Sequence, residues 1–366
     1  MVEPGPDFIP PFCPNPRCSF HLDSQGWRFK KDGTHLRRFD HRRIQRYRCH
    51  HCRRSFSSQT FSTTYWLKRP DLLEEVLHGL LACSCYRQMG RARRVSPATI
   101  ELQAARLGRH MLLFHELHRP RGVPREAIVL DGFETFEFSQ YWITHLNTVL
   151  GAESHFTYAT TLAELRRKGR MTSRQKRRRA QLEARYGRPD PKAIEKSVAE
   201  ALALVVPPGS PEVVLLSDEH RAYPRALQRL PDRCFQHEVT SSKAPRTPTN
   251  PLFPANLLHL LMRHSGSNQK RETIAWSKKK QSMCWRDAAH RVWRNWMKHF
   301  SERRKQGSPA MKLGLVDRLL TWQEILAQRL FATRILLEGP LEDYYWGRIP
   351  TRQMPKGREH RGGYAY

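Results

Sequence analysis

Two aspartates stand at the ends of apolar runs, where they could hold a metal ion together. Asp131 follows Ala127 to Leu130 and precedes Gly132, and Asp218 follows Val213 to Ser217. Continuous apolar runs of this length favour strands that are buried on both faces. Burying a carboxylate at the end of such a strand is costly unless a cation compensates its charge. The shared environment therefore predicts a metal site formed by Asp131 and Asp218.

Each aspartate also has an explanation without chemistry. Asp131 before Gly132 fits a turn, and Asp218 fits the cap of a helix that begins at His220. Either explanation is sufficient for one residue alone. Two acids in the same setting, within a strongly basic chain, favour the metal site instead.

A third carboxylate is expected from Glu272, early in a predicted helix on which Lys279 lies two turns later on the same face. Two aspartates on strands and one glutamate on a helix form an oxygen ligand set suited to Mg²⁺ or Mn²⁺. Two such ions about 3.5–4 Å apart would stabilise the attacking and leaving oxygens of a phosphoryl displacement. Lys279 would hold a phosphate beside them. Asp287 competes with Glu272 for the third position, and Glu302 is a weaker candidate.

The segments that must position these acids have patterns of their own. Residues 142–147 and 155–160 predict two strands that continue the strand at Asp131 as an antiparallel meander. Residues 193–206 predict an amphipathic helix before the strand at Asp218. The basic run 166–185 is typical of a solvated helical face or mobile loop and could contact a nucleic-acid backbone.

Two cysteine pairs near the N-terminus predict a zinc site. Cys13 and Cys18 form the first pair, and Cys49 and Cys52 form the second about thirty residues later. Cysteines this close can reach one ion, and two such turns complete a tetrahedral thiolate site. The pattern predicts a zinc ribbon over residues 1–70, with four unrelated thiols as the alternative.

Polar residues around the cysteine pairs suggest further roles. Three histidines are substitute ligands or, as we expect, solvent-facing bystanders, namely His21, His50 and His51. Arginines surround the second pair, and among them Arg53 and Arg54 fit contacts to phosphates, which provide affinity without reading sequence.

Residues 71–120 predict a helix-turn-helix. Leucines at helical spacing give a first helix, a short segment follows, and Ser96 then caps a second long helix. This order delivers a recognition helix to the major groove. We expect Thr99, Gln103 and Arg106 on its exposed, DNA-facing surface. A plain helical packing unit is the alternative.

The composition points to a polyanionic partner. The 366 residues carry a formal net charge of +30, which favours nucleic acid or an anionic membrane surface. No apolar run approaches the ~20 residues needed to span a bilayer, and the N-terminus lacks the pattern of a signal peptide. We expect a cytoplasmic protein without a membrane partner. A basic protein without chemistry, as in a ribosome, is the alternative.

The order of these motifs resembles that of bacterial insertion-sequence transposases over roughly residues 10–300. The shared features are the Tyr-x-Cys-x-x-Cys ribbon, the helix-turn-helix, Asp131, the motif Ser217-Asp218-x-His-x-x-Tyr223, and Glu272. The resemblance implies an α/β, ribonuclease-H-like (retroviral-integrase-like) catalytic core at 121–310 with an Asp-Asp-Glu triad. Asp131, Asp218 and Glu272 would be its magnesium or manganese ligands, with His220 and Lys279 as neighbours.

The resemblance also implies partners and a location. Double-stranded DNA, at the element ends and at the target, would be bound by a homo-oligomer in the bacterial cytoplasm with the nucleoid. The expected activity is metal-dependent strand cleavage and strand transfer. A non-catalytic DNA-binding regulator is the main alternative, and a nuclease that acts in repair or on RNA is a third. Residues 311–366 predict a helix over 313–337 and, from Arg348, a mobile basic tail.

Overall fold

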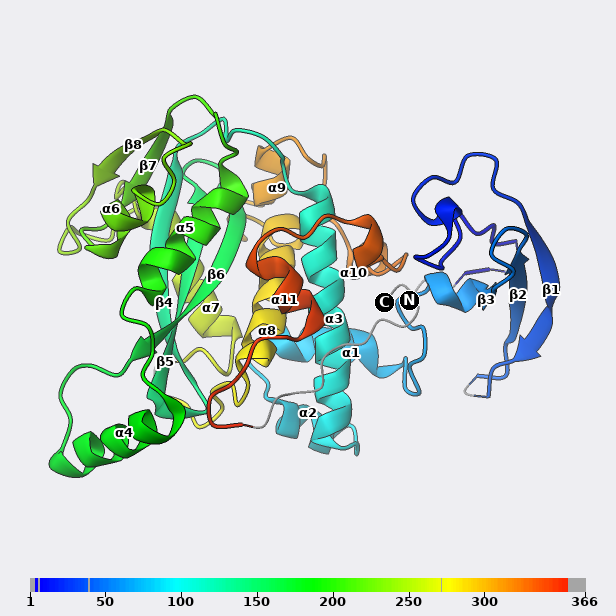
Figure 1. Ribbon diagram of the computed structural model, residues 1–366, viewed down its shortest axis with the longest axis horizontal. Coiled ribbons are helices and arrows are strands. Elements are labelled where there is room, and N and C mark those ends of the chain that lie inside the picture. The colour runs from blue at the N-terminus through cyan, green and yellow to red at the C-terminus, as the bar shows by residue number, and fades with distance from the viewer. Residues whose placement is uncertain (1–3, 6, 39, 271, 355–366) are drawn as a thin grey trace.

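The computed structural model describes residues 4–5, 7–38, 40–270 and 272–354 of the chain. A small N-terminal unit lies beside a larger α/β body along the long axis of the molecule (Figure 1). The small unit contains an antiparallel sheet with the strand order β1-β2-β3. Its strands are β1 (Phe29–Leu36), β2 (Arg43–Cys49) and β3 (Ser55–Ser57).

The body is built on a mixed five-stranded sheet with the order β6-β5-β4-β7-β8. The first three strands in sequence pair antiparallel, which confirms the expected meander. The last two run parallel to β4. The strands are β4 (Ile128–Glu137), β5 (Ser139–Gly151), β6 (Thr157–Arg166), β7 (Val213–Ser217) and β8 (Phe235–Val239).

Helices cover both faces of this sheet. Successive side chains of a strand point to opposite faces, and β4 is apolar on both. Ile128 and Leu130 pack in a cluster with α5 (Ala193–Val205), whereas Val129 and Phe133 pack with α7 (Phe253–Ser265). The continuous apolar run before Asp131 is therefore explained by a strand between two helical layers.

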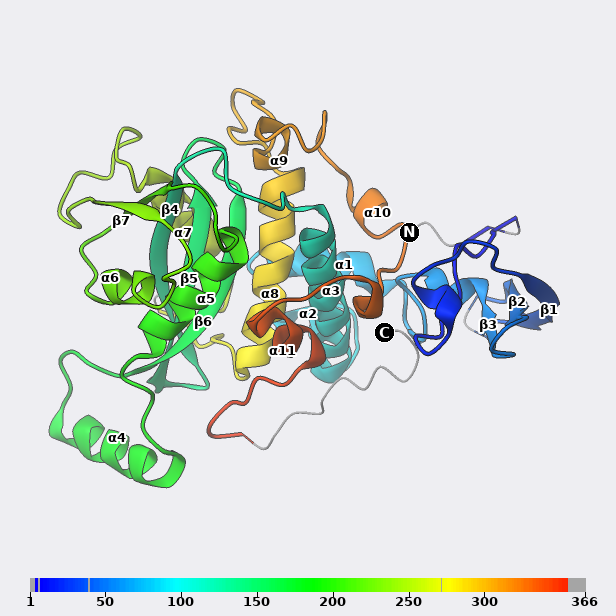
Figure 2. The same ribbon diagram turned by 45° about the horizontal axis from the view of Figure 1, so that its top comes forward.

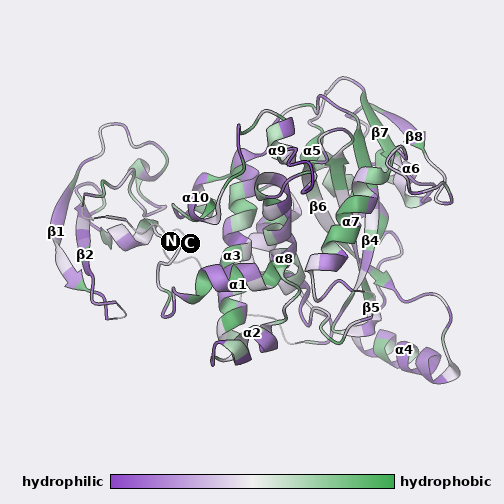
Figure 3. Cartoon of the chain, turned by 180° about the vertical axis from the view of Figure 1, so that it is seen from behind, coloured by the Kyte–Doolittle hydropathy of each residue, from purple (hydrophilic) through white to green (hydrophobic). Residues whose placement is uncertain are grey.

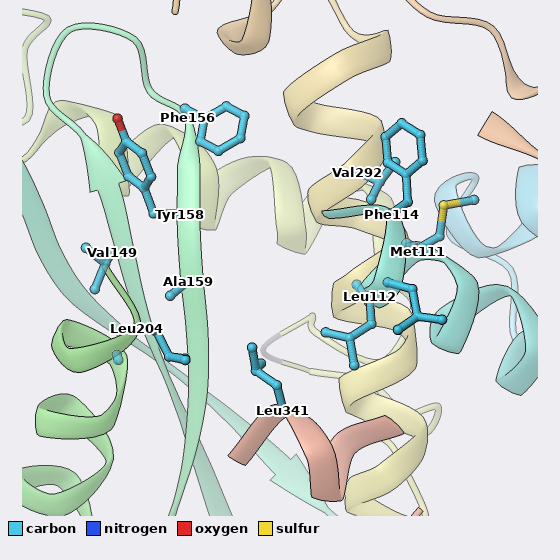
Figure 4. Packing of buried hydrophobic residues seen from close by; sticks show 14 of the residues in the cluster. Met111, Leu112, Phe114, Val149, Phe156, Tyr158, Ala159, Leu204, Val292 and Leu341 are labelled. Atoms are coloured by element: carbon cyan, nitrogen blue, oxygen red, sulfur yellow. The ribbon is translucent and has the colours of Figure 1, made fainter. Parts of the chain in front are cut away.

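Two long helices extend the core on the α5 side. α3 (Pro97–His118) crosses α8 (Lys280–Val292). Figure 4 shows Met111, Leu112 and Val292 of this pair in one cluster with Tyr158 of β6 and with Phe156, which directly precedes β6. Gly108 allows the close crossing, because a Cβ there would lie 2.2 Å from the Cβ of Trp285.

The expected order of helix, short helix, turn and helix is confirmed. α1 (Leu72–Leu81) and α2 (Tyr86–Ala92) precede α3. Ser96 caps α3 as expected, since its hydroxyl accepts a hydrogen bond from the N–H of Ala98 at 3.2 Å. These helices share one hydrophobic cluster with the sheet and α8, so they are part of the body.

The remaining helices are short, except α4. They are α4 (Ser173–Tyr186), α6 (Ala222–Leu227), α9 (Pro309–Lys312), α10 (Trp322–Ile325) and α11 (Pro340–Trp346), with 3₁₀ turns at Ser19–His21, Ser58–Phe61 and Ala332–Arg334 and a π-helical turn at Trp293–Met297. None of the described helices is long and apolar enough to cross a lipid bilayer.

The expectation of one helix over 313–337 is wrong. The chain turns at Gly314, whose φ of +68° lies in the left-handed region, and only short helical turns follow. The apolar residues of the segment 313–337 pack in two separate cores instead. Ile325 and Leu326 join the core of the body, and Phe331 joins the core of the N-terminal unit.

The C-terminal segment connects the two units. Phe331 stacks edge-on with Phe12 at 5.2 Å between ring centroids, and the N–H of Arg329 donates to the carbonyl of Phe61 at 2.9 Å. His21 contacts the hydroxyl of Thr333 at 2.8 Å. The N-terminal unit is thus fixed by a segment about 270 to 310 residues away in sequence.

The expected basic tail is only partly described, because residues 355–366 lie outside the described residues. Its first residues are bound to the body. Thr351 is buried and its hydroxyl accepts the N–H of Lys280 at 2.9 Å. Arg352 donates to the carbonyl of Tyr186 at 2.8 Å and contacts Glu164.

Candidate active site

The parallel pairing of β4 and β7 places Asp131 beside Asp218. Leu130 is paired with Ser217, and each aspartate is the next residue on its strand. Neighbouring strands lie roughly 4.8 Å apart, so the two carboxylates meet at one place. Asp131 Oδ1 accepts the N–H of Gly132 at 2.7 Å, and Asp218 Oδ1 accepts the N–H of His220 at 3.0 Å.

The local structure does not match the simpler explanations for these acids. Asp131 lies within β4 and not in a turn. Asp218 precedes α6 by several residues, and the N-cap of α6 is Arg221. Both carboxylates are therefore placed by the sheet.

The electrostatics of Asp131 favour a nearby cation. Burial raises the pKa of Asp131 to about 6, and the charge of Asp218 adds to this rise, although the N–H of Gly132 and the charge of Arg246 oppose it. Tyr223 is buried close by, and burial together with both aspartates raises the pKa of its hydroxyl. Two carboxylates in this position repel each other, and a metal ion would remove the repulsion.

Both acids line a groove of about 600 Å³ between the sheet, α7 and the loop 241–250. Arg246 lies on that loop, is exposed, and makes no hydrogen bond or ion pair with any residue that the structure describes. Arg263 extends from α7, and its guanidinium lies over the ring of Phe133 at 4.3 Å from the centroid. The groove therefore combines three acids, Asp131, Glu134 and Asp218, with two arginines.

His259 of α7 faces Asp131 across the groove. Its Nδ1 lies 3.5 Å from Asp131 Oδ2, and its Nε2 lies 3.2 Å from the hydroxyl oxygen of Thr148. Thr148 uses its own proton on the carbonyl of Asp131, at 3.1 Å. If this proton stays on the carbonyl of Asp131, the Thr148 oxygen accepts from His259, and the imidazole proton would then be on Nε2.

This tautomer makes His259 a candidate metal ligand. Burial lowers the pKa of His259 to about 3, and nearby positive groups reinforce the shift, so the ring is neutral near pH 7. Its Nδ1 then presents a lone pair to the Asp131 carboxylate, and two acceptors 3.5 Å apart gain nothing from each other. A cation between them would satisfy both. The ligand atoms of Asp131, Asp218 and His259 do not all lie within 4.8 Å of one another among the described residues, so the three side chains would have to move closer to hold one ion.

The structure does not bring Glu272 to this site. The helix expected at Glu272 is absent, because this exposed residue lies in a bend between α7 and α8. Its segment follows the far end of β4, where the hydroxyl of Thr135 bonds to Asn268 and Phe138 to Ser277. Glu272 is not among the residues that line the groove.

The other expected neighbours and competitors lie elsewhere. Lys279 directly precedes α8 and pairs with Glu101 of α3 at 2.8 Å. Asp287 is buried inside the body, where burial raises its pKa and Arg291 opposes the rise. Glu302 pairs with Lys298. None of these residues lines the groove that holds Asp131 and Asp218.

The four cysteines form a second, closed site. The sulfurs of Cys13, Cys18, Cys49 and Cys52 all lie within 4.8 Å of one another, and among the described residues this is the only such group of three or more potential ligands. The indole N–H of Trp27 donates to Cys49 Sγ at 3.2 Å. Burial raises the pKa of Cys49, but this hydrogen bond and backbone N–H groups outweigh it and lower the pKa to about 7. Burial raises the pKa of Cys13 and Cys18, so it is the closeness of the four sulfurs that suits a zinc site.

The three histidines near the ribbon divide into two kinds. His50 and His51 are exposed, as expected. The expectation for His21 is wrong, because it is 1% exposed. Its ring bonds to the carbonyl of Cys13 at 2.8 Å and to Thr333, so it braces the first cysteine turn against the C-terminal segment.

The candidate DNA-binding residues are also placed differently. Arg53 and Arg54 are exposed beside Cys52, and Thr99 is half-buried at the start of α3. The expected exposure of Gln103 is wrong, because its side chain is 3% exposed and donates to the carbonyl of Arg69 at 2.8 Å. Arg106 is half-buried and donates to the carbonyl of Thr63 at 3.3 Å. Most residues of α3 between Gln103 and Glu116 are buried, so its exposed residues lie near its two ends.

The residues that sequence reasoning missed lie on α7. Asn256, His259 and Arg263 line the groove at spacings of three and four residues, which places them on one helical face. The available signal was the polar stripe through the otherwise apolar run 252–262, with Pro254 at its start. It is weak, because nothing local indicates that the stripe faces an aspartate.

The comparisons with known proteins do not show a family for this chain. No protein-family model matches the chain, and no curated protein matches it. One similar solved structure is a chain from a cryo-EM structure of a simian T-cell lymphotropic virus intasome in complex with PP2A regulatory subunit B56 gamma. The identity is 11% over 56% of this chain and 61% of that chain, with a TM-score of 0.23. A score this low carries no argument, so the site must be interpreted from its own geometry.

Proposed function

We propose that this protein is a DNA transposase that cleaves and joins DNA strands at a divalent-metal site, on a ribonuclease-H-like core. The observation that carries the proposal is the meeting of Asp131 and Asp218 at adjacent parallel strands, with His259 Nδ1 at 3.5 Å from Asp131 Oδ2. The net charge of +30 supports a nucleic-acid substrate, and Arg246 and Arg263 place two cations on the walls of the groove.

The ligands of the metal would be Asp131, Asp218 and His259. When bound, Mg²⁺ or Mn²⁺ supplies charge stabilisation to a phosphate that is being displaced. The imidazole favours Mn²⁺ over Mg²⁺, because nitrogen ligands suit transition metals and oxygen ligands suit Mg²⁺. In this proposal His259 takes the place that the sequence resemblance gave to Glu272.

The residues of the chain itself would bind and orient the DNA. Arg246, exposed on the loop 241–250, and Arg263 on α7 lie on the walls of the groove and would bind phosphate oxygens on either side of the reacting bond. Thr148 would keep the His259 proton on Nε2 and thereby the lone pair on Nδ1. The four-cysteine site would bind Zn²⁺ and hold the ribbon folded for contacts through Arg53 and Arg54.

The test is cleavage and strand transfer of labelled duplex DNA with Mn²⁺ or Mg²⁺. We expect Asp131→Ala and Asp218→Ala to lower the cleavage rate by at least ~10³-fold, since each removes a metal ligand, while DNA affinity is retained. The matched control is Glu153→Ala, an exposed acid outside the groove. Wild-type cleavage by Asp131→Ala would reject the proposal.

A regulator that binds DNA without cutting it is the second candidate, because the ribbon and the helix-turn-helix do not depend on the groove. It predicts sequence-specific binding that survives Asp131→Ala and Asp218→Ala together, with no metal-dependent nicking by the wild type. A nuclease without joining activity would cleave but give no strand-transfer product. We further propose that the active form is a homo-oligomer on DNA in the bacterial cytoplasm, which light scattering of the DNA complex would test.

A further inference from the structure

The segment 166–188, which we term the basic arm, extends away from the body. It leaves β6 at Arg166, contains α4, and returns toward α5. Figures 1 and 2 both show α4 projecting beyond the ends of β5 and β6, with no other element around it. The groove with Asp131 and Asp218 does not include any residue of the arm.

The arm concentrates positive charge. It contains eleven Lys or Arg residues and one acid, Glu183, which gives a net charge of +10. A third of the formal charge of the chain therefore lies in 23 of its 366 residues. Glu183 is already paired, with Arg166 at 2.8 Å and Arg179 at 3.5 Å. Most of the positive charge is not neutralised within the arm.

Three cations on α4 are available to a ligand. Arg174, Lys176 and Arg177 are exposed, and their side chains make no hydrogen bond or ion pair with any residue in the described part of the chain. Arg178 is also exposed, and its one contact is a long hydrogen bond of 3.4 Å to Gln181. These side chains lie in the first two turns, so they form one compact patch.

The helix has no apolar face that would explain its position. Leu182 is the one buried residue of α4, and Figure 3 shows the helix as mainly hydrophilic. A helix that binds a membrane surface needs an apolar face opposite its charges, and a helix that docks on protein needs an apolar stripe. A hydrophilic, cationic helix fits a polyanion that is contacted only through its charges.

The base of the arm is fixed. The Thr172 side chain caps α4 by accepting the N–H of Gln175 at 3.2 Å, and Arg179 donates to the carbonyl of Arg167 at 2.8 Å. At the other end, Arg352 from the C-terminal segment donates to the carbonyl of Tyr186 at 2.8 Å while contacting Glu164 of β6. Because these contacts already order the arm, ligand binding would carry little entropic cost for ordering it.

The position of the arm suits an extended ligand. α4 lies on the side of the body that is remote from the N-terminal unit, as do β7 and α6 (Figures 1 and 2). Duplex DNA carries one charge per roughly 1.7 Å of its axis and continues past any groove that holds it. We propose that the basic arm binds the phosphate backbone of duplex DNA without reading its sequence, as a second contact outside the groove.

This inference rests on the proposed function for the choice of DNA as the polyanion. The experiment is therefore designed without cleavage. Duplex affinity is measured over a range of salt concentrations by fluorescence anisotropy, with no added divalent metal and in an Asp131→Asn background. Two unrelated 30-base-pair duplexes are compared, together with single-stranded DNA and RNA of the same length.

The arm variant is Arg174→Gln, Arg177→Gln and Arg178→Gln combined. Each lost phosphate contact lowers the log–log salt slope by roughly 0.9, so we expect a decrease of roughly 2 to 3 and affinity weaker by roughly 10- to 100-fold at low salt. The decrease should be equal for the two duplexes. Helix content from circular dichroism should be unchanged, because these side chains make no tertiary contact.

The matched control removes the same charge elsewhere. Arg303, Arg304 and Lys305 are exposed in the turn before α9, and their combined change to Gln should leave the slope nearly unchanged. Equal losses in both variants, or no loss in the arm variant, would overturn the proposal. A loss confined to RNA or single-stranded DNA would also overturn it, in favour of that ligand.

A second measurement locates the contact directly. A photo-crosslinking residue at Ala184, which is exposed on α4, should label duplex DNA, whereas one at Gln306 in the control turn should not. Failure of the proposed function is distinguished by its own result. In that case the wild type would show no metal-dependent cleavage, while the arm variant would still lower the salt slope.

Discussion

The cysteine cluster of the ribbon and the groove for which we propose a metal ion are built in opposite ways. In the ribbon, two short turns each supply a cysteine pair, and all four sulfurs lie within 4.8 Å of one another. In the groove, β4, β7 and α7 supply one ligand each, and these ligands do not meet the same distance criterion. The first site is closed, and the second is open along a groove of about 600 Å³.

The difference follows from what each site would do. A structural zinc site uses every coordination position for protein ligands and thereby contributes folding energy. A catalytic site must leave room for substrate, so its ligands are spread and are held by the surrounding fold. The comparison predicts that losing a ligand unfolds the first site but only inactivates the second.

The largest effect is expected in the ribbon. Cys49→Ser should abolish zinc binding, whose free energy in small zinc modules is on the order of 10 kcal/mol, and should make residues 1–70 sensitive to protease. Metal analysis and limited proteolysis would measure this. The control is Cys234→Ser, at an exposed cysteine outside the site. A protease-resistant ribbon in Cys49→Ser would show that the site is not structural.

The next prediction tests whether His259 or Glu272 is the third metal ligand. We expect His259→Ala to lower the cleavage rate by roughly 10²- to 10³-fold without changing folding, because it removes a ligand from an open site. Glu272→Ala should cleave at the wild-type rate, because Glu272 lies outside the groove. The opposite result would restore the Asp-Asp-Glu triad implied by the sequence resemblance.

The same residue should set metal preference. His259→Asp replaces a nitrogen ligand by oxygen, so it should shift preference from Mn²⁺ toward Mg²⁺ by roughly tenfold or more. Electron paramagnetic resonance of bound Mn²⁺, with Mg²⁺ as competitor, measures this without any reaction. Identical competition curves for the wild type and His259→Asp would show that position 259 does not contact the metal.

Asp131 should destabilise the metal-free protein. Its pKa is raised from 3.8 to about 6, so the fold favours the protonated form, and stability is lost as pH rises from about 4 to about 6. A shift of about two units corresponds to roughly 3 kcal/mol. Asp131→Asn should therefore be more stable than the wild type by up to this amount above pH 6, and nearly equal to it near pH 4. Denaturant unfolding at pH 4 and 7.5 would measure the difference, and a constant difference across that range would contradict the prediction.

The smallest effect concerns Thr148. Thr148→Val keeps the shape but removes the acceptor that holds the His259 proton on Nε2. Loss of such an outer contact typically costs 10- to 100-fold in metal affinity, and we expect the lower part of that range. Mn²⁺ titration would measure it, with Thr144→Val as control, a buried threonine of the same strand. Unchanged affinity would mean that Thr148 does not orient the ligand.

Much of the fold could be predicted from local patterns. The apolar runs before Asp131 and Asp218, the meander and the cap at Ser96 depend on neighbouring residues, and the structure contains all of them. The helix predicted over 313–337 does not form, because the apolar residues of this segment pack in two different hydrophobic cores. The exposure predicted for Gln103 is wrong because its side chain bonds to the carbonyl of Arg69, 34 residues earlier in the chain.

The sequence by itself determined the pair of cysteine turns and the pair of acidic strand ends, because each depends on a short run of adjacent residues. Only the tertiary structure decided which side chain faces Asp131. That choice depends on the register of β7 against β4 and on the rotation of α7 above them. Register and helix rotation are set by the packing of both faces of the sheet, and no local spacing encodes them. The position of His259 beside Asp131 therefore follows from the packing of α7 and not from the sequence around it.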